Sequence, residues 1–179
     1  MKRHLLFVLA LLVTSAAARA QSPQVAFTWD DLPAHSALPQ GTSRVAIAQT
    51  ILKAMHDAGL PPAYGFVNGV QIEREPASAP VLGAWRDAGM PLGNHTWTHM
   101  NLNERTVEEF EADLERNEPL LKKLMPDSDA WRWLRFPYLA EGETPAKRNA
   151  VRSYLLQHGY RIAGVTMSFG DYALSLIHI

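Results

Sequence analysis

The sequence predicts an α/β fold built on a parallel sheet, and three observations lead to this expectation. Short apolar runs alternate with amphipathic helical patterns along nearly the whole chain. The helical patterns end in glycine or ahead of proline, shortly before the next apolar run. No low-complexity linker divides the 179 residues, so one domain is expected. Such alternation is typical of a doubly wound sheet or of a (β/α) barrel.

The expected elements can be taken in chain order. Five strands are expected, each a short apolar run: 25–28, 64–67, 90–93, 133–136 and 161–165. Four helices are expected, each with apolar residues at helical spacing: 43–58, 78–88, 106–125 and 145–158. The first helix has Thr42 or Ser43 as its cap and ends at Gly59.

Local signals mark the ends of the first three expected helices. The triplet Asp57-Ala58-Gly59 recurs as Asp87-Ala88-Gly89, each time at the end of a helix and just before a strand. The longest helix opens with a capping box formed by Thr106 and Glu109, and it ends before Pro126. These repeated helix-to-strand connections favour parallel strands.

The first 20 residues have the pattern of a signal peptide. Lys2 and Arg3 form a basic start, residues 5–13 are apolar, and Ala18-Arg19-Ala20 supplies a small-x-small cleavage pattern. This apolar run is too short to cross a bilayer, which takes about 20 residues. We therefore expect a signal peptide at 1–20, a mature chain from Gln21, and export to the periplasm or the cell exterior. No integral membrane segment is expected after cleavage.

Composition excludes several classes of partner. Apolar residues make up 47% of the chain and charged residues 20%, which is the balance of a globular protein. The net charge is −1, and removal of a leader that contains only basic charges makes the rest more acidic. Without a basic run, the chain is not expected to bind nucleic acid. It has no cysteine, so no disulfide supports the exported domain.

Two adjacent carboxylates follow the first expected strand. Asp30 and Asp31 come at the end of the run Phe27-Thr28-Trp29. Neighbouring carboxylates repel each other unless a cation or a proton relieves them. An ordinary Asp-rich turn is the alternative interpretation of this pair taken alone.

A pair of histidines follows the third expected strand. His95 and His99 are four residues apart, and we expect one face of a helical turn to present both to one ion. No glutamate lies between them to act as a base. Together with Asp31 they supply two nitrogens and one oxygen, the ligand set of a catalytic zinc site with open positions. Asp30 is then the spare carboxylate, free to act as a general base.

A third cluster, Arg135-Phe136-Pro137-Tyr138, follows the fourth expected strand. Arg135 is able to hold a carboxylate through two hydrogen bonds. Pro137 restricts the backbone, so that the N–H of Tyr138 can face the site. Taken alone, the cluster is better explained as an ordinary arginine and an aromatic residue at the rim of a barrel.

In this order the clusters resemble the polysaccharide deacetylase family, also called carbohydrate esterase family 4, which shares a NodB homology domain. Thr28-Trp29-Asp30-Asp31-Leu32 is similar to the family motif Thr-Phe-Asp-Asp-Gly, and it departs at Trp29 and Leu32. His95-Thr96-Trp97-Thr98-His99 matches His-Ser/Thr-x-x-His. Residues 135–138 match Arg-x-Pro-Tyr/Phe. Gly170-Asp171-Tyr172 is a weak match to a fourth motif.

The resemblance implies a distorted (β/α) barrel, a divalent metal that is commonly zinc, and an acetylated polysaccharide or oligosaccharide substrate. The expected metal ligands are Asp31, His95 and His99. Asp30 is the expected base, Arg135 orients it, and the Tyr138 N–H helps to hold the oxyanion. Trp29 and Trp97 are candidates for stacking on sugar rings, with buried packing as the alternative.

The end of the chain departs from the expected family pattern. Leu176-Ile177-His178 fits a fifth motif, Leu-x-His, but it follows Asp171 too closely for the segments that separate the two motifs. We interpret residues 174–179 as a translated sequencing adapter, so His178 is not a site residue. A barrel takes about eight strands and ~250 residues. We therefore expect a deacetylase domain at 21–173 that is incomplete at its C-terminus.

The sequence predicts a metal-dependent hydrolase that removes acetyl groups from N-acetylated polysaccharide or peptidoglycan sugars. De-O-acetylation of acetylxylan is the alternative reaction. A secreted, non-catalytic relative that binds sugar or metal is the alternative from another class of function.

Overall fold

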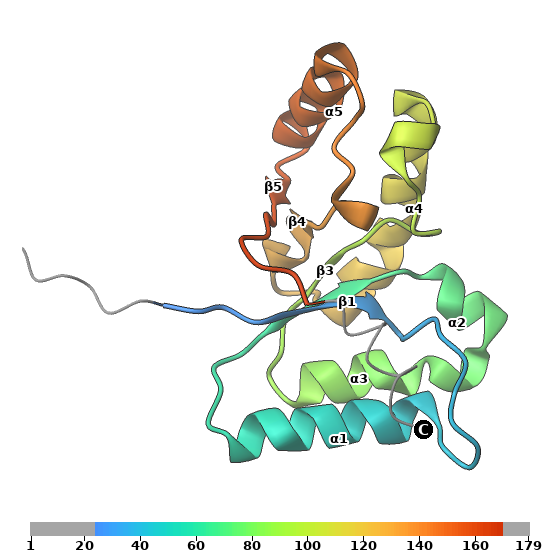
Figure 1. The fold of residues 1–179 in the computed structure, drawn as a ribbon, viewed down its shortest axis with the longest axis vertical. Coiled ribbons are helices and arrows are strands. Elements are labelled where there is room, and N and C mark those ends of the chain that lie inside the picture. Colours follow the sequence, from blue (N-terminus) through green and yellow to red (C-terminus); the bar gives the residue numbers. More distant parts are fainter. Residues whose placement is uncertain (1–23, 170–179) are drawn as a thin grey trace, which may run out of the picture.

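The computed structural model describes residues 24–169, which form a parallel sheet surrounded by helices (Figure 1). The five strands are β1 Thr28–Leu32, β2 Tyr64–Val67, β3 Leu92–Asn94, β4 Trp133–Leu134 and β5 Arg161–Ile162. The α-helices are α1 Arg44–Asp57, α2 Val70–Arg74, α3 Pro80–Asp87, α4 Val107–Leu124 and α5 Pro145–Gln157. Short 3₁₀ helices span Pro76–Ser78, Leu102–Glu104, Asp129–Arg132 and Pro137–Leu139.

The strand order identifies the architecture. The strands pair in the order β1-β2-β3-β4-β5, and all four pairings are parallel. Right-handed crossovers between consecutive neighbours place every connecting helix on the same side of the sheet. A doubly wound sheet needs helices on both sides and a reversal of strand order. The sheet is therefore the curved wall of a (β/α) barrel, as expected.

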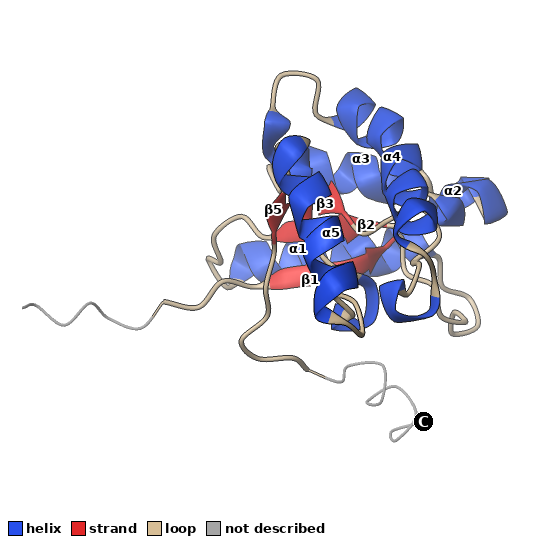
Figure 2. Cartoon of the chain, turned by 90° about the horizontal axis from the view of Figure 1, so that it is seen from above, coloured by secondary structure: helices blue, strands red, loops and turns tan. Residues whose placement is uncertain are grey.

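The helices form an outer layer in the same order as the strands. Helix α1 packs on α3, α3 contacts α4, and α4 contacts α5. Seen from above, the helices surround the strands (Figure 2). The core between the two layers is made of fully buried apolar side chains: Val67, Leu82, Trp85, Leu92, Phe110, Leu114, Leu121, Leu134 and Leu155. None of the helices in this part of the chain is long and apolar enough to cross a bilayer.

Two expectations about the elements are wrong. The first strand lies at Thr28–Leu32, not at 25–28, because Thr28 pairs with Tyr64, the first residue of β2. Val25 and Phe27 are exposed ahead of it. The short helix α2 was not expected, because its five residues are too few to show a period. The remaining strands and helices lie where expected, although β4 and β5 are shorter.

Caps account for the helix starts. The Ser43 side chain accepts a hydrogen bond from the Ala46 N–H at the start of α1. The Thr106 hydroxyl and the Glu109 carboxylate form the expected capping box at the start of α4. Thr144 caps α5 in the same way as Ser43 caps α1. These side chains satisfy backbone donors that have no partner within the helix.

A buried asparagine, Asn94, ties the end of β3 to its neighbours. Its amide nitrogen donates to the Leu114 carbonyl (3.1 Å) and to the Tyr160 hydroxyl (3.0 Å). Its oxygen accepts from the Thr96 N–H (2.9 Å) and from the Asn117 side chain (3.0 Å). All the hydrogen-bonding capacity of the amide is used, which is what a fully buried polar group requires.

Asn94→Leu should lower the free energy of unfolding by roughly 2–4 kcal/mol, because it leaves several buried donors and acceptors without partners. Denaturant unfolding followed by circular dichroism measures the change. The matched control is Asn149→Leu, since Asn149 is exposed on α5, and it should shift stability by less than about 0.5 kcal/mol. Equal effects of the two substitutions would contradict the structural role of Asn94.

Candidate metal and catalytic site

The candidate site lies at the carboxyl ends of β1, β3 and β4. Asp30 and Asp31 belong to the last residues of β1, His95 follows β3 directly, and Arg135 follows β4 directly. Parallel strands bring these ends to one edge of the sheet, where (β/α) barrels place their active sites. The fold thus brings together residues that lie up to 105 positions apart in the sequence.

A bulge at the end of β1 separates the two adjacent carboxylates. The pairing of β1 with β2 shifts register between Trp29 and Leu32, and Asp31 has a left-handed φ of 60°. Aspartate tolerates this conformation better than most residues do. A bulge redirects side chains. As a result, Asp30 faces Arg135, whereas Asp31 faces the histidines.

The segment from His95 to His99 is a loop, so the expected helical turn is wrong. Thr96 and His99 have φ values of 59° and 61°, outside the right-handed helical region. The second half of this loop is bound to α4: the Trp97 N–H donates to the Asp113 carbonyl, and the Thr98 N–H and hydroxyl donate to the Asp113 carboxylate. Helix α4 therefore helps to set the conformation of the loop that carries both histidines.

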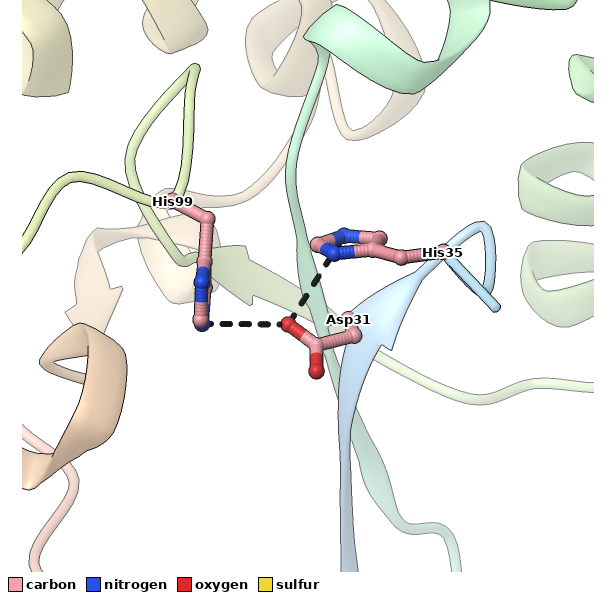
Figure 3. Close-up of side chains that lie close together, drawn as sticks. All are labelled: Asp31, His35 and His99. Atoms are coloured by element: carbon pink, nitrogen blue, oxygen red, sulfur yellow. Dashed lines mark ion pairs between the residues drawn. The ribbon is translucent and has the colours of Figure 1, made fainter. Parts of the chain in front are cut away.

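Three imidazoles from two segments of the chain converge on one carboxylate oxygen. Asp31 Oδ1 lies 3.4 Å from His95 Nε2 and 3.3 Å from His99 Nε2. A third imidazole, that of His35, has its Nε2 3.7 Å from the same oxygen. Figure 3 shows the rings of His35 and His99 on either side of the Asp31 carboxylate. The structure thus brings together the three expected ligands, and it adds a histidine that was not expected.

The tautomer of His95 follows from its second ring nitrogen. His95 Nδ1 lies 2.7 Å from the carbonyl oxygen of Arg135, which can only accept a hydrogen bond. Nδ1 therefore carries the proton, and in the neutral ring Nε2 presents a lone pair to Asp31 Oδ1. Histidines that bind metals usually donate their other N–H to a carbonyl or carboxylate in this way.

These contacts fit a cation. Asp31 Oδ1 is buried and has no hydrogen-bond donor. A lone pair of His95 and a carboxylate oxygen that face each other repel unless a positive charge lies between them. In a tetrahedral zinc site with ligands at about 2.0–2.2 Å, two ligand atoms lie roughly 3.3–3.6 Å apart. The two distances from Asp31 Oδ1 to His95 and His99 are within this spacing.

The surroundings lower the pKa values of His35, His99 and Asp31. Burial, followed by repulsion from the neighbouring imidazoles, lowers the pKa of His99 from 6.5 to about 4, although Asp31 opposes the shift. Burial also lowers the pKa of His35. Burial would raise the pKa of Asp31, but the contact with His95 and the attraction of His35 and His99 outweigh it and lower that pKa. Neutral imidazole and ionised carboxylate are the forms that bind metals.

Arg135 holds Asp30 beside this cluster. Its Nη1 donates to both Asp30 oxygens, at 3.2 Å and 3.1 Å. Its Nη2 donates to the Thr28 hydroxyl, and its Nε donates to the Ala163 carbonyl. The guanidinium lies over the Phe66 ring, 4.8 Å from the ring centroid. Because Arg135 is buried and fully bound, it fixes the position of the Asp30 carboxylate.

Tyr138 forms part of the rim of the site. It follows Pro137 with a left-handed φ of 57°, and its ring centroid lies 4.4 Å from that of His99. The side chain is largely exposed, at 68%. The Tyr138 ring therefore lies next to the imidazole cluster, on the solvent side.

The two tryptophans near the motifs serve packing. The Trp29 ring meets Trp85 edge to face, with centroids 6.4 Å apart. Trp97 stacks under the Arg116 guanidinium at 4.7 Å and covers Gly69, where a Cβ atom would lie only 2.1 Å from the Trp97 ring. The packing alternative thus holds for both residues.

Sequence reasoning missed His35, Asn68 and Asp113. His35 follows Asp31 at the same i,i+4 spacing as the recognised histidine pair, and this signal was available in the sequence. Asn68 and Asp113 act through hydrogen bonds to the loop of His95, which no local pattern reveals.

Asp171, His178 and the expected leader and adapter segments lie outside the described residues.

The chain belongs to the polysaccharide deacetylase family, whose profile matches residues 17–163. Solved structures of carbohydrate esterases of family 4 share the fold. A family 4 carbohydrate esterase from Streptomyces lividans has a TM-score of 0.60 and 23% identity over 84% of this chain. The chitin deacetylase of Colletotrichum lindemuthianum has a TM-score of 0.60 and 22% identity over 83%. A peptidoglycan deacetylase of Bacillus subtilis has a TM-score of 0.60 and 21% identity over 84%.

The matches cover only part of these relatives. The chain spans 66% of the Streptomyces chain, 57% of the Colletotrichum chain and 62% of the Bacillus chain. A comparison with curated protein sequences gives no match.

The stability of the metal-free chain should fall as the pH is lowered from about 6.5 to about 4. The unfolded chain binds a proton at His99 at a higher pH than the folded chain does, so protons favour unfolding in this window. Urea unfolding at several pH values measures the slope. His99→Gln should reduce it, whereas His56→Gln, at an exposed position of α1, should leave it as it is. An unchanged slope in His99→Gln would contradict the environment described for His99.

Proposed function

We propose that the chain is a metal-dependent hydrolase that removes acetyl groups from N-acetylated polysaccharide or peptidoglycan sugars. The observation that carries this proposal is the buried Asp31 Oδ1, which has no hydrogen-bond donor and faces the Nε2 atoms of His95 and His99. Beside it stands a second carboxylate, Asp30, held by Arg135. One carboxylate for the ion and one for proton transfer is the division of roles that metal-assisted hydrolysis requires.

Asp31, His95 and His99 would hold the ion, which we take to be zinc because imidazole and carboxylate ligands suit it. A divalent ion in such a site lowers the pKa of water and polarises a carbonyl group. The chain itself fixes the direction of the ligand atoms: the Arg135 carbonyl orients the His95 ring, and Asp113 holds the loop that carries His99.

Asp30 is the proposed general base. Its carboxylate takes a proton from the attacking water, and Arg135 keeps the two oxygens in place during this transfer. Arg135 is buried and bound on all three of its nitrogens, so it orients Asp30 without competing for substrate. The Tyr138 N–H is the proposed donor to the developing oxyanion, since the Tyr138 ring packs beside the His99 ring at the rim of the site.

The relatives support this class of substrate. The Colletotrichum protein is a chitin deacetylase, the Bacillus protein is a peptidoglycan deacetylase, and the Streptomyces esterase was solved in complex with acetate. Removal of an acetyl group from a sugar polymer is named in two of these descriptions, and the third names a carbohydrate esterase with acetate bound. Such polymers lie outside the cytoplasm, which agrees with the proposed export of the chain by a signal peptide at 1–20. De-O-acetylation of acetylxylan is the alternative reaction at the same site.

A non-catalytic role is the second candidate. A family 4 protein from Bacillus anthracis that is described as a pseudoenzyme has a TM-score of 0.55 and 17% identity over 76% of this chain. In the present chain, however, Asp30 and Arg135 retain their ion pair at 3.1 Å. A protein that only binds sugar has no use for a base fixed in this way, so the hydrolase is favoured.

Asp30→Asn and Asp31→Asn should have different effects. In a protein that carries the complete deacetylase domain, Asp30→Asn should keep the zinc content near that of the unsubstituted protein and lower the rate of acetate release by roughly two to four orders of magnitude. Asp31→Asn should lose zinc, because an amide is a poorer ligand than a carboxylate. Asp127→Asn, at an exposed position, is the control for the same chemical change. Equal loss of zinc in both site variants would show that the roles of general base and metal ligand are assigned wrongly between Asp30 and Asp31.

Acetate release from three polymers distinguishes the candidate reactions. With zinc supplied, a protein that carries the complete deacetylase domain should release acetate from chito-oligosaccharides or peptidoglycan faster than from acetylxylan. A preference for acetylxylan would replace the proposed reaction by de-O-acetylation. Binding of zinc and sugar without acetate release from any polymer would instead favour the non-catalytic role.

A further inference from the structure

His35 lies where a metal ligand would lie, yet it belongs to none of the motifs shared with the family. It follows β1 by three residues and stands four residues after Asp31. Its side chain is half-buried, at 28% exposure, and its Nε2 lies 3.7 Å from Asp31 Oδ1. The ring meets His99 edge to face, with centroids 5.4 Å apart.

The ligand atoms of three residues lie together without His95. One nitrogen from His35, one from His99 and one carboxylate oxygen of Asp31 all lie within 4.8 Å of one another. Figure 3 shows both rings directed at the same Asp31 oxygen. With His95 Nε2 at 3.4 Å, three imidazole nitrogens surround a single oxygen that has no hydrogen-bond donor. A fourth group is therefore within reach of an ion bound at Asp31.

Asn68 explains where the His35 ring lies when no ion holds it. The Asn68 amide nitrogen donates to the carbonyls of His95 (2.5 Å) and Thr96 (3.0 Å), so its oxygen is turned towards His35. His35 Nε2 lies 2.9 Å from that oxygen and donates to it. The same nitrogen thus has two neighbours, the Asn68 oxygen and the metal-facing oxygen of Asp31. Coordination of an ion at this nitrogen would require the proton to lie on Nδ1, and a coordinate bond would then take the place of the hydrogen bond to Asn68.

We infer that His35 is a third imidazole ligand of the divalent ion held by Asp31, His95 and His99. The inference rests on the proposed function, because it requires that an ion binds at Asp31. Three nitrogens and one oxygen fill four positions, and zinc expands to five when a water or substrate enters. A centre with more imidazole ligands binds its ion more tightly than one with two.

X-ray absorption at the zinc edge tests the inference, because scattering from imidazole rings reports how many histidines bind the ion. The chain loaded with one zinc should show three imidazoles, and His35→Ala should show two. The affinity of His35→Ala for zinc, measured by competition with a chromogenic chelator, should fall by more than the ~10–100-fold that loss of an outer hydrogen-bond partner costs. His56→Ala, at an exposed position on α1, should match the original chain in both measurements.

The number of imidazoles bound to zinc in the original chain decides whether His35 is a ligand. This result does not depend on whether His35→Ala folds. Two imidazoles in the original chain, with the same two in His35→Ala, would overturn the role of His35 and leave the proposed function intact. A chain that binds no zinc would overturn the proposed function itself. His35→Gln is a second variant that keeps a side chain of similar reach, and it should also give a count of two.

Discussion

Both halves of the candidate site depend on one residue, Arg135. Its carbonyl oxygen accepts the Nδ1–H of His95 at 2.7 Å, and this bond turns the other ring nitrogen towards Asp31. Its guanidinium binds both oxygens of Asp30. Arg135 also belongs to the sheet edge, because its N–H donates to the Asn94 carbonyl. The proposed ligand set and the proposed base are thus oriented by the backbone and the side chain of a single buried residue, so a shift of β4 would disturb both.

Buried amides transmit the geometry of the sheet to the histidine loop. Asn94, at the end of β3, binds α4 and the Thr96 N–H, whereas Asn68, after β2, binds the carbonyls of His95 and Thr96. All of these groups are buried, so each bond lost leaves an unpaired polar atom, which costs about 1–3 kcal/mol. The loop is therefore fixed in a conformation with two left-handed residues that it would not adopt by itself. The position of His99 is a consequence of this network more than of local sequence.

The sequence was sufficient for those parts of the site that follow from strand ends and residue chemistry. Parallel strands had to bring Asp31, His95 and Arg135 to one edge, and the structure brings them there. The conformation between them was not predictable. The bulge that turns Asp31 away from Asp30 depends on pairing with β2, and the histidine loop depends on Asp113 of α4, 14 positions beyond His99. His35 was overlooked although its spacing from Asp31 is that of the histidine pair, because only the tertiary structure places it beside His99.

The central claim is that the unpaired Asp31 oxygen faces a bound cation. Diffraction from crystals of the chain grown with zinc, recorded on both sides of the zinc absorption edge, tests it most directly. The account predicts one anomalous peak within about 2.2 Å of a carboxylate oxygen of Asp31 and of a ring nitrogen from each of His95 and His99. A zinc peak elsewhere, with a water or a protein N–H bound to Asp31 Oδ1 in its place, would contradict it.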